Sequence, residues 1–139
     1  MDYSHGLQAA IRRARTEALA NDHIHITLEH FLLGLTYDPA VESVIRHCGG
    51  SIVGIRASLI RYFIDECAEI VGPAPTTPAP TIDLNQVLRT AQTQASSRNQ
   101  AVNSAHALFA LLETKGDAYA LRLLLGEHVT KEKLVQFFA

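Results

Sequence analysis

The histidines are the side chains in this sequence with types and spacing that could do chemistry. Their spacing raises the question of a metal site. His23, His25 and His30 lie close together, and Glu29 stands beside the last of them. Imidazole nitrogens and carboxylate oxygens are ligands that zinc accepts in proteins. A His-x-His pair at the end of a helix is nevertheless a weak signal, and no HExxH motif or CxxC pair supports it. We predict no metal and no cofactor, which leaves a small metal- or ligand-binding enzyme as the weakest alternative.

Two of the histidines, His30 and His106, recur 76 residues apart. Each is the third helical residue after an expected N-cap, Thr27 or Asn103, whose side-chain oxygen can accept a hydrogen bond from a free amide of the first turn. A ring at this position can pack on the preceding loop or bond to it. We therefore interpret both histidines as structural.

The sequence lacks the patterns that catalysis needs. Acid–base chemistry requires two carboxyl groups in one cleft, and the second copy of the Glu29 turn has Ala105 instead. No GxxxxGK[ST] loop and no GxSxG elbow is present. Cys48 and Cys67 form no CxxC pair, and Cys67 follows Phe63 at apolar helical spacing. We predict a non-catalytic domain with free thiols, of which Cys67 is buried.

Charge and hydropathy narrow the range of partners. The net charge is −2, and we interpret Arg12, Arg13 and Arg15 as one solvent-exposed helical turn rather than a basic stripe for nucleic acid. No apolar run approaches the ~18 residues that span a bilayer, and the N-terminal residues lack the apolar segment of a signal peptide. We predict a cytoplasmic protein that binds neither nucleic acid nor membrane.

The elements that must position these residues are helices. In the first half, apolar residues recur at three- and four-residue steps, and the expected helix starts follow capping residues. A first helix ends at 21–23, Thr27 begins a second helix with Glu29 in its first turn, and Asp38 and Ser51 begin a third and a fourth. The predicted buried positions are Leu7, Ile11, Ala14, Ala18, Leu28, Phe31, Leu32, Leu35, Val41, Val44, Ile45, Ile52, Ile55, Leu59 and Phe63.

A proline-rich segment interrupts this pattern. Four of the five prolines fall within 72–80, so the segment is expected to be extended and not helical. Two interpretations stay open. The segment is either a passive linker or a strap that packs across the helices and holds the two halves together.

After the prolines the helical pattern starts again. Leu84, Val87, Leu88, Ala91 and Ala95 repeat the spacing of the first helix, and Asn103 stands where Thr27 stood. We predict one all-α domain over 1–139, made of two tandem four-helix repeats packed as a pseudo-twofold bundle. Repeat 1 covers about 2–68, a linker about 69–80, and repeat 2 about 81–139. No period-two alternation occurs, so we predict no strands. Separately, we expect the domain to be a monomer.

Two segments resemble a known family. The run TLEHFLL from Thr27 to Leu33, followed by Asp38-Pro39, and the run PTIDLNQVLRTA from Pro80 to Ala91 are similar to the N-terminal domain of Clp/Hsp100 AAA+ unfoldases, most of all the ClpA type. The likeness covers essentially the whole chain. It implies a docking module for adaptors or protein substrates, tethered above an ATPase ring, with a ClpS-like adaptor as the expected partner.

The resemblance also implies where a partner binds. Carried over by position, it points to His23, Glu29, Thr81 and Gln86 as partner-binding residues. The family often has Arg at Gln86 and an acid at Ile24, so two charged contacts with an adaptor are missing here. Ala105 likewise removes the second acid with which some relatives recognise phosphoarginine. The alternative is a free-standing protein of the same fold that modulates Clp adaptor or substrate binding.

Overall fold

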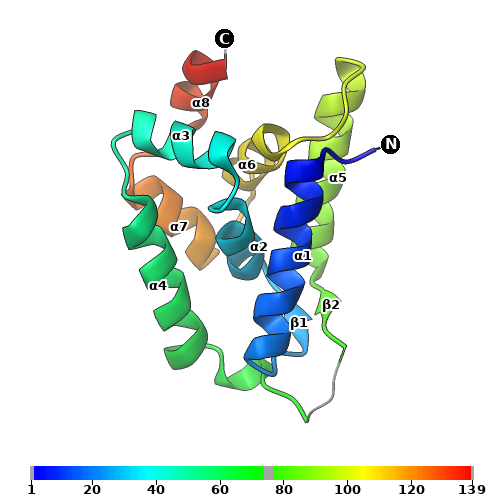
Figure 1. Cartoon of the computed structure of the whole chain (residues 1–139), viewed down its shortest axis with the longest axis vertical. Coiled ribbons are helices and arrows are strands. Elements are labelled where there is room, and N and C mark those ends of the chain that lie inside the picture. Colours follow the sequence, from blue (N-terminus) through cyan, green and yellow to red (C-terminus); the bar gives the residue numbers. More distant parts are fainter. Residues whose placement is uncertain (1, 74–76, 139) are drawn as a thin grey trace.

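The computed structural model describes residues 2–73 and 77–138; residues 74–76, within the proline-rich segment, lie outside them. The helices in this part of the chain fall into two sets of four, as predicted (Figure 1). The first set is α1 His5–Ala20, α2 Leu28–Leu35, α3 Pro39–His47 and α4 Ile52–Asp65. The second set is α5 Ile82–Ser97, α6 Ser104–Leu112, α7 Tyr119–Gly126 and α8 Lys131–Phe138.

The core lies where the two sets meet. α1 packs against α2 and α5 against α6, while α3 contacts α6 and α2 contacts α7 across the repeats. Leu32 of α2 and Leu108 of α6 are both completely buried. The prediction that Leu32 belongs to the core is therefore confirmed, and the bundle is held together by apolar residues from both repeats.

Local capping explains where the helices begin. Ser4, Thr27, Asp38, Ser51, Thr81 and Asn103 each accept a hydrogen bond from an amide of the first turn that follows. These bonds satisfy amides that have no partner inside the helix. Asp22, two residues after the last residue of α1, has a left-handed backbone with φ of 56°. Such a conformation closes a helix, and Asp adopts it more readily than most residues.

The prediction of no strands is wrong. β1 (His25–Ile26) pairs in parallel with β2 (Ala79–Pro80). The ladder bonds run from Ala79 N to Ile24 O and from Thr81 N to Ile26 O, so Pro80, which lacks an N–H, is not required to donate. Strands of two residues are too short to leave a period-two pattern in the sequence.

The described parts of the proline-rich segment are held against repeat 1. A 3-10 turn at Ala68–Ile70 leads into it, Ile24 N donates to Ile70 O, and Gly72 N donates to Asp22 O. Pro78 is buried. Of the two interpretations left open by the sequence, the strap is the one that these contacts support.

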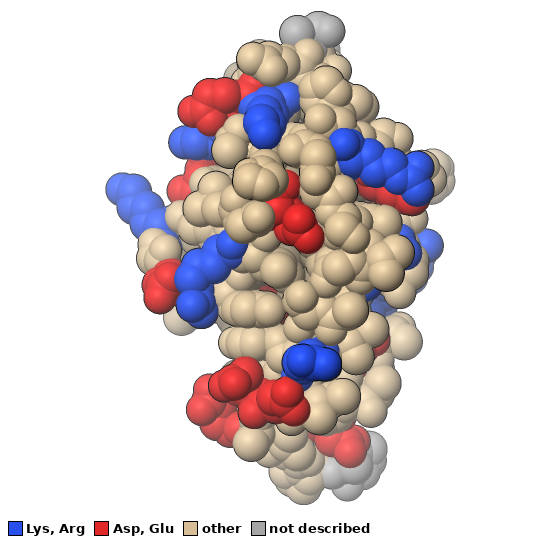
Figure 2. All heavy atoms as spheres, turned by 90° about the vertical axis from the view of Figure 1, so that its left-hand side faces the viewer, with Lys and Arg blue, Asp and Glu red and all other residues tan. Residues whose placement is uncertain are grey.

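Charges of both signs are scattered over the face that carries α3, α4 and α7, with no broad basic stripe (Figure 2). Arg12, Arg13 and Arg15 are exposed, as expected. None of the described helices is long and apolar enough to cross a membrane. Cys48 and Cys67 are buried free thiols, and burial is the main reason that the pKa of Cys67 rises to about 11.

Candidate functional site

A reciprocal capping box organises the start of α2. Thr27 Oγ1 accepts from His30 N at 3.4 Å, and His30 Nδ1 accepts from Thr27 N at 2.9 Å. Because Nδ1 accepts, the proton of the neutral ring lies on Nε2. That nitrogen is 2.8 Å from His23 Nδ1, to which it donates. The box thus fixes the tautomers of two histidines in series.

This first-repeat turn is closed. The ring of His30 is completely buried and stacks on Phe63 of α4, with centroids 4.5 Å apart and planes 11° from parallel. His23 is 1% exposed, and its Nε2 makes no hydrogen bond within the described residues. Burial lowers the pKa of His30 to about 3, with the neighbouring His23 adding to the effect. Burial also lowers the pKa of His23.

The carboxylate of Glu29 is hydrogen-bonded within the molecule. The residue is 7% exposed, and its Oε2 accepts from Ala120 N at 3.0 Å, in the first turn of α7. The N-cap position of α7 is Ala118, which has no side-chain oxygen to offer. Glu29 therefore supplies, from the other repeat, the acceptor that α7 lacks locally.

The matching junction of the other repeat needs no such help. α3 is capped by its own Asp38, whose Oδ1 accepts from Ala40 N at 2.9 Å. Asp38 Oδ2 also accepts from Ser104 Oγ at the start of α6. Position 105 can therefore be alanine without leaving a helix start uncapped. The second repeat therefore needs no acid at the position that matches Glu29.

The second-repeat turn has the same box but an open environment. Asn103 Oδ1 accepts from His106 N, and His106 Nδ1 accepts from Asn103 N, each at 3.0 Å. The neutral ring again carries its proton on Nε2. No aromatic ring covers His106 among the described residues, and its ring is half-buried. Burial lowers the pKa of His106, and the charge of Arg98 lowers it further.

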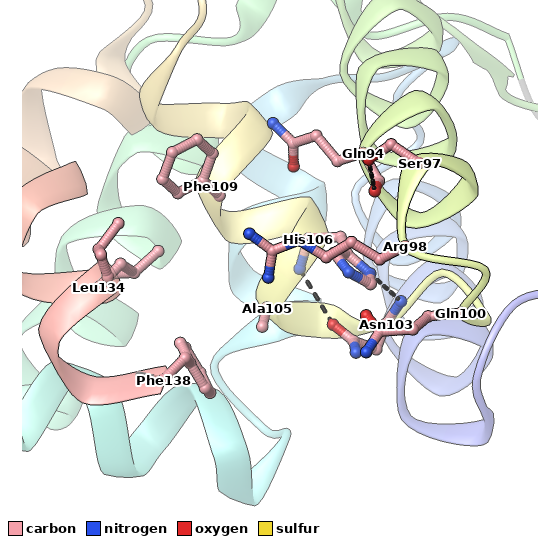
Figure 3. A pocket seen from close by; sticks show the side chains of 11 residues that line it. Gln94, Ser97, Arg98, Gln100, Asn103, Ala105, His106, Phe109, Leu134 and Phe138 are labelled. Atoms are coloured by element: carbon pink, nitrogen blue, oxygen red, sulfur yellow. Dashed lines mark hydrogen bonds between the residues drawn. The ribbon is translucent and has the colours of Figure 1, made fainter.

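The open space beside His106 is a groove of about 500 Å³ between the end of α5, α6 and α8 (Figure 3). We call it the second-repeat groove. Its floor and one wall are apolar, while amide side chains and Arg98 line the opposite wall. Its lining residues are Gln94, Ser97, Arg98, Gln100, Asn103, Ala105, His106, Phe109, Leu134, Val135 and Phe138.

The four residues predicted to bind a partner do not form one exposed surface. His23 and Glu29 are buried in the interior. Thr81 caps α5 and is bonded to Ile26, and Gln86 is exposed one turn further along α5. A docked protein would reach His23 or Glu29 only if neighbouring elements moved. Their part in partner binding stays a prediction.

The sequence-based reasoning missed the second-repeat groove. Neither Arg98 nor Phe138 was singled out from the sequence, and the Phe138 side chain is 46% exposed. One signal was available. Phe137 and Phe138 are adjacent, and neighbours on a helix point about 100° apart, so both could not face the core. A metal role for the histidines has no geometric support, because the described residues contain no cluster of three metal-binding side chains.

The sequence matches one family model over residues 2–124, that of the Clp repeat (R) N-terminal domain. The chain belongs to this Clp repeat family. A curated relative, the ClpA homolog protein of Fuscovulum blasticum, is 28% identical over 99% of this chain. The match covers 17% of that relative, so the chain spans about one-sixth of its length.

Solved Clp-type N-domains share the fold. The Hsp104 N-terminal domain from Candida albicans superposes with a TM-score of 0.81 at 16% identity, covering all of this chain and 93% of the other. The N-domain of ClpV from Vibrio cholerae gives 0.79 at 22% identity, covering 99% of this chain and 83% of the other. The same kind of N-domain has been solved in complex with a VipB peptide, with a TM-score of 0.77 at 22% identity, covering 99% of this chain and 85% of the other.

Proposed function

We propose that this Clp repeat domain is a non-catalytic docking module of a ClpA-like ATP-dependent unfoldase, working in the cytoplasm. It receives segments of adaptors or protein substrates for unfolding and proteolysis. The observation that carries the proposal is the second-repeat groove, an open channel with an apolar floor and one apolar wall, on a bundle whose other capping turn is filled by its own side chains.

The lining of the groove suits a protein segment. Phe109 and Phe138 offer aromatic surface, and aromatic residues dominate the energetics of protein interfaces. The amides of Gln94 and Gln100 can pair with the backbone of a bound chain. The ClpV N-domain, which has the same fold, has been solved with a bound peptide. That precedent supports peptide binding here without fixing the same site or the same sequence.

A ClpS-like adaptor is the finer part of the proposal, and it uses a different surface. Gln86 is exposed on α5, and Ile82, one turn earlier, is 76% exposed. Thr81 holds this end of α5 to β1 through its N–H. In this scheme Glu29 and His23 act indirectly, by fixing the elements beneath the contact surface. Isothermal titration with a ClpS-like adaptor should show binding that weakens in Gln86→Ala, and no heat from folded wild-type protein would remove the adaptor from the proposal.

The docking function can be tested by blocking the groove. Fluorescein-labelled β-casein, an unstructured protein, serves as the probe in fluorescence anisotropy with the 139-residue chain. We expect saturable binding to the wild type and a loss of at least about ten-fold in affinity for Ala105→Trp, whose indole fills the channel. Ala57→Trp is the matched control, because Ala57 is an exposed helical alanine on α4, away from the groove.

Circular dichroism melts check that both tryptophan variants remain folded. Equal weakening by both variants, or no binding of β-casein to the wild type, would contradict docking in the second-repeat groove.

A further inference from the structure

The electrostatics of the second-repeat groove define which segments it can hold. Among its lining residues Arg98 is the only charged side chain, and none of the others is acidic. Arg98 is exposed, and no ion pair or hydrogen bond involves its guanidinium within the described residues. The groove therefore presents one uncompensated positive charge opposite an apolar wall.

The position of Arg98 makes that charge available to a ligand. The side chain extends from the end of α5 across His106, and its guanidinium lies between Phe109 and Ala105, toward the open channel and α8 (Figure 3). His106 adds a second donor, because its Nδ1 accepts from Asn103 N and its Nε2 therefore carries a proton. Both groups can donate to an anion and neither can accept from a cation in this state.

The comparison of the repeats shows what keeps the charge uncompensated. In repeat 1 the position that matches Ala105 is Glu29, whose carboxylate is used by α7. With alanine at 105, no acid on the first turn of α6 can pair with Arg98. The alanine also leaves room over the apolar floor of the groove.

We infer that the second-repeat groove selects segments in which an Asp or Glu side chain lies among apolar residues, with the carboxylate pairing with Arg98. This inference rests on the proposed docking function and adds its selectivity. Guanidinium and carboxylate form bidentate, charge-assisted hydrogen bonds. The apolar residues on either side of the acid cover Phe109, Leu134 and Phe138. A lysine or arginine at the same place in the segment would meet Arg98 as a like charge.

Three peptides test the selectivity directly. They share one apolar frame of Leu and Phe, are acetylated and amidated so that no terminal charge contributes, carry fluorescein, and differ only in a central Asp, Asn or Lys. We expect the Asp peptide to bind about five-fold more tightly than the Asn peptide, the size expected of a single partly exposed ion pair. The Lys peptide should bind most weakly, and added NaCl should reduce the Asp preference.

Variants of the protein assign the preference to one side chain. Arg98→Gln should bind the Asp and Asn peptides equally, while Arg98→Lys should keep part of the preference. Arg89→Gln is the matched control: it removes an exposed cation from the same helix outside the groove and should keep the full preference. Ala105→Glu, which restores the acid of repeat 1 beside Arg98, should abolish the preference.

Each outcome has a defined meaning. If all three peptides bind the wild type equally, docking stands and the inference of acid selectivity is overturned. A preference that survives in Arg98→Gln, or that is lost equally in Arg89→Gln, overturns the assignment to Arg98. If no peptide binds while β-casein does, the acid-segment inference fails and the docking function survives. If none of the probes binds, both fail together.

Discussion

The capping turns of α2 and α6 share a local design and differ in what surrounds them. In both, a polar N-cap and a histidine three residues later satisfy each other's amides. In the first repeat the 14-residue helix α4 brings Phe63 over His30. The second ring nitrogen of His30, Nε2, is hydrogen-bonded to His23 Nδ1. In the second repeat the corresponding space is the second-repeat groove. One local motif can thus lie in a sealed interior or at the edge of an open groove, depending on the helices packed beside it.

The largest difference between the turns should appear when their aromatic neighbours are removed. Phe63→Ala should destabilise the fold by about 3–5 kcal/mol, because a buried ring leaves a cavity above His30. Phe138→Ala should cost less than about 1 kcal/mol, since that ring is already half-exposed. Urea unfolding followed by circular dichroism measures both. Equal losses would mean that the two turns are equally closed.

The buried histidine pair should make stability depend on pH. The folded-state pKa of His30 is lowered to about 3, below its unfolded value of about 6.5, so the unfolded chain binds more protons between these values. Stability is therefore full above pH 6.5 and falls as the pH drops toward 3, with about 2 kcal/mol lost from His30 by pH 5.

Glutamine variants isolate that effect in urea titrations across pH. His30→Gln keeps an acceptor for the capping box and removes the titrating ring, so it should flatten the pH dependence. His106→Gln should change the slope less, because His106 is half-buried. A steep slope retained in His30→Gln would contradict the assignment.

The acid of the first-repeat turn, Glu29, has no counterpart in the second-repeat turn, where Ala105 stands. Glu29→Ala should cost about 1–3 kcal/mol, because Ala120 N is left buried and α7 has no other cap. This exceeds the few tenths that a simple helix-dipole contact would give. Glu29→Gln, which keeps an acceptor oxygen, should recover much of the loss in thermal melts. No measurable loss in Glu29→Ala would show that water replaces the contact.

The smallest effect should be the same in both repeats. Thr27→Ala and Asn103→Ala each remove an N-cap acceptor and should each cost about 1 kcal/mol. Differential scanning calorimetry can compare the two losses. A clearly larger loss for Thr27→Ala would indicate that its cap also supports the buried histidine pair.

Local patterns predicted much of this fold. The caps at Thr27 and Asn103, the end of α1 and the buried leucines could be recognised because their partners lie within four residues along the chain. The β1–β2 ladder could not, since its two short strands leave no pattern and are separated by more than fifty residues. The exposure of the four residues predicted to bind a partner could not be derived from the sequence, because burial depends on which helices pack over a residue, and the structure buries His23 and Glu29.

The sequence by itself determined the two copies of one helical unit, the helix starts at Thr27, Asp38, Ser51 and Asn103, and the presence of a histidine in both capping turns. Those features arise from hydrogen bonds and apolar spacing within a few residues. Only the tertiary structure decided that Glu29 caps α7 across 91 residues of chain, that Phe63 seals one turn, and that Arg98 lies beside the other turn with no ion pair among the described residues. These outcomes depend on which helices are brought together by burial of a shared apolar core, and that packing is not encoded in any local pattern.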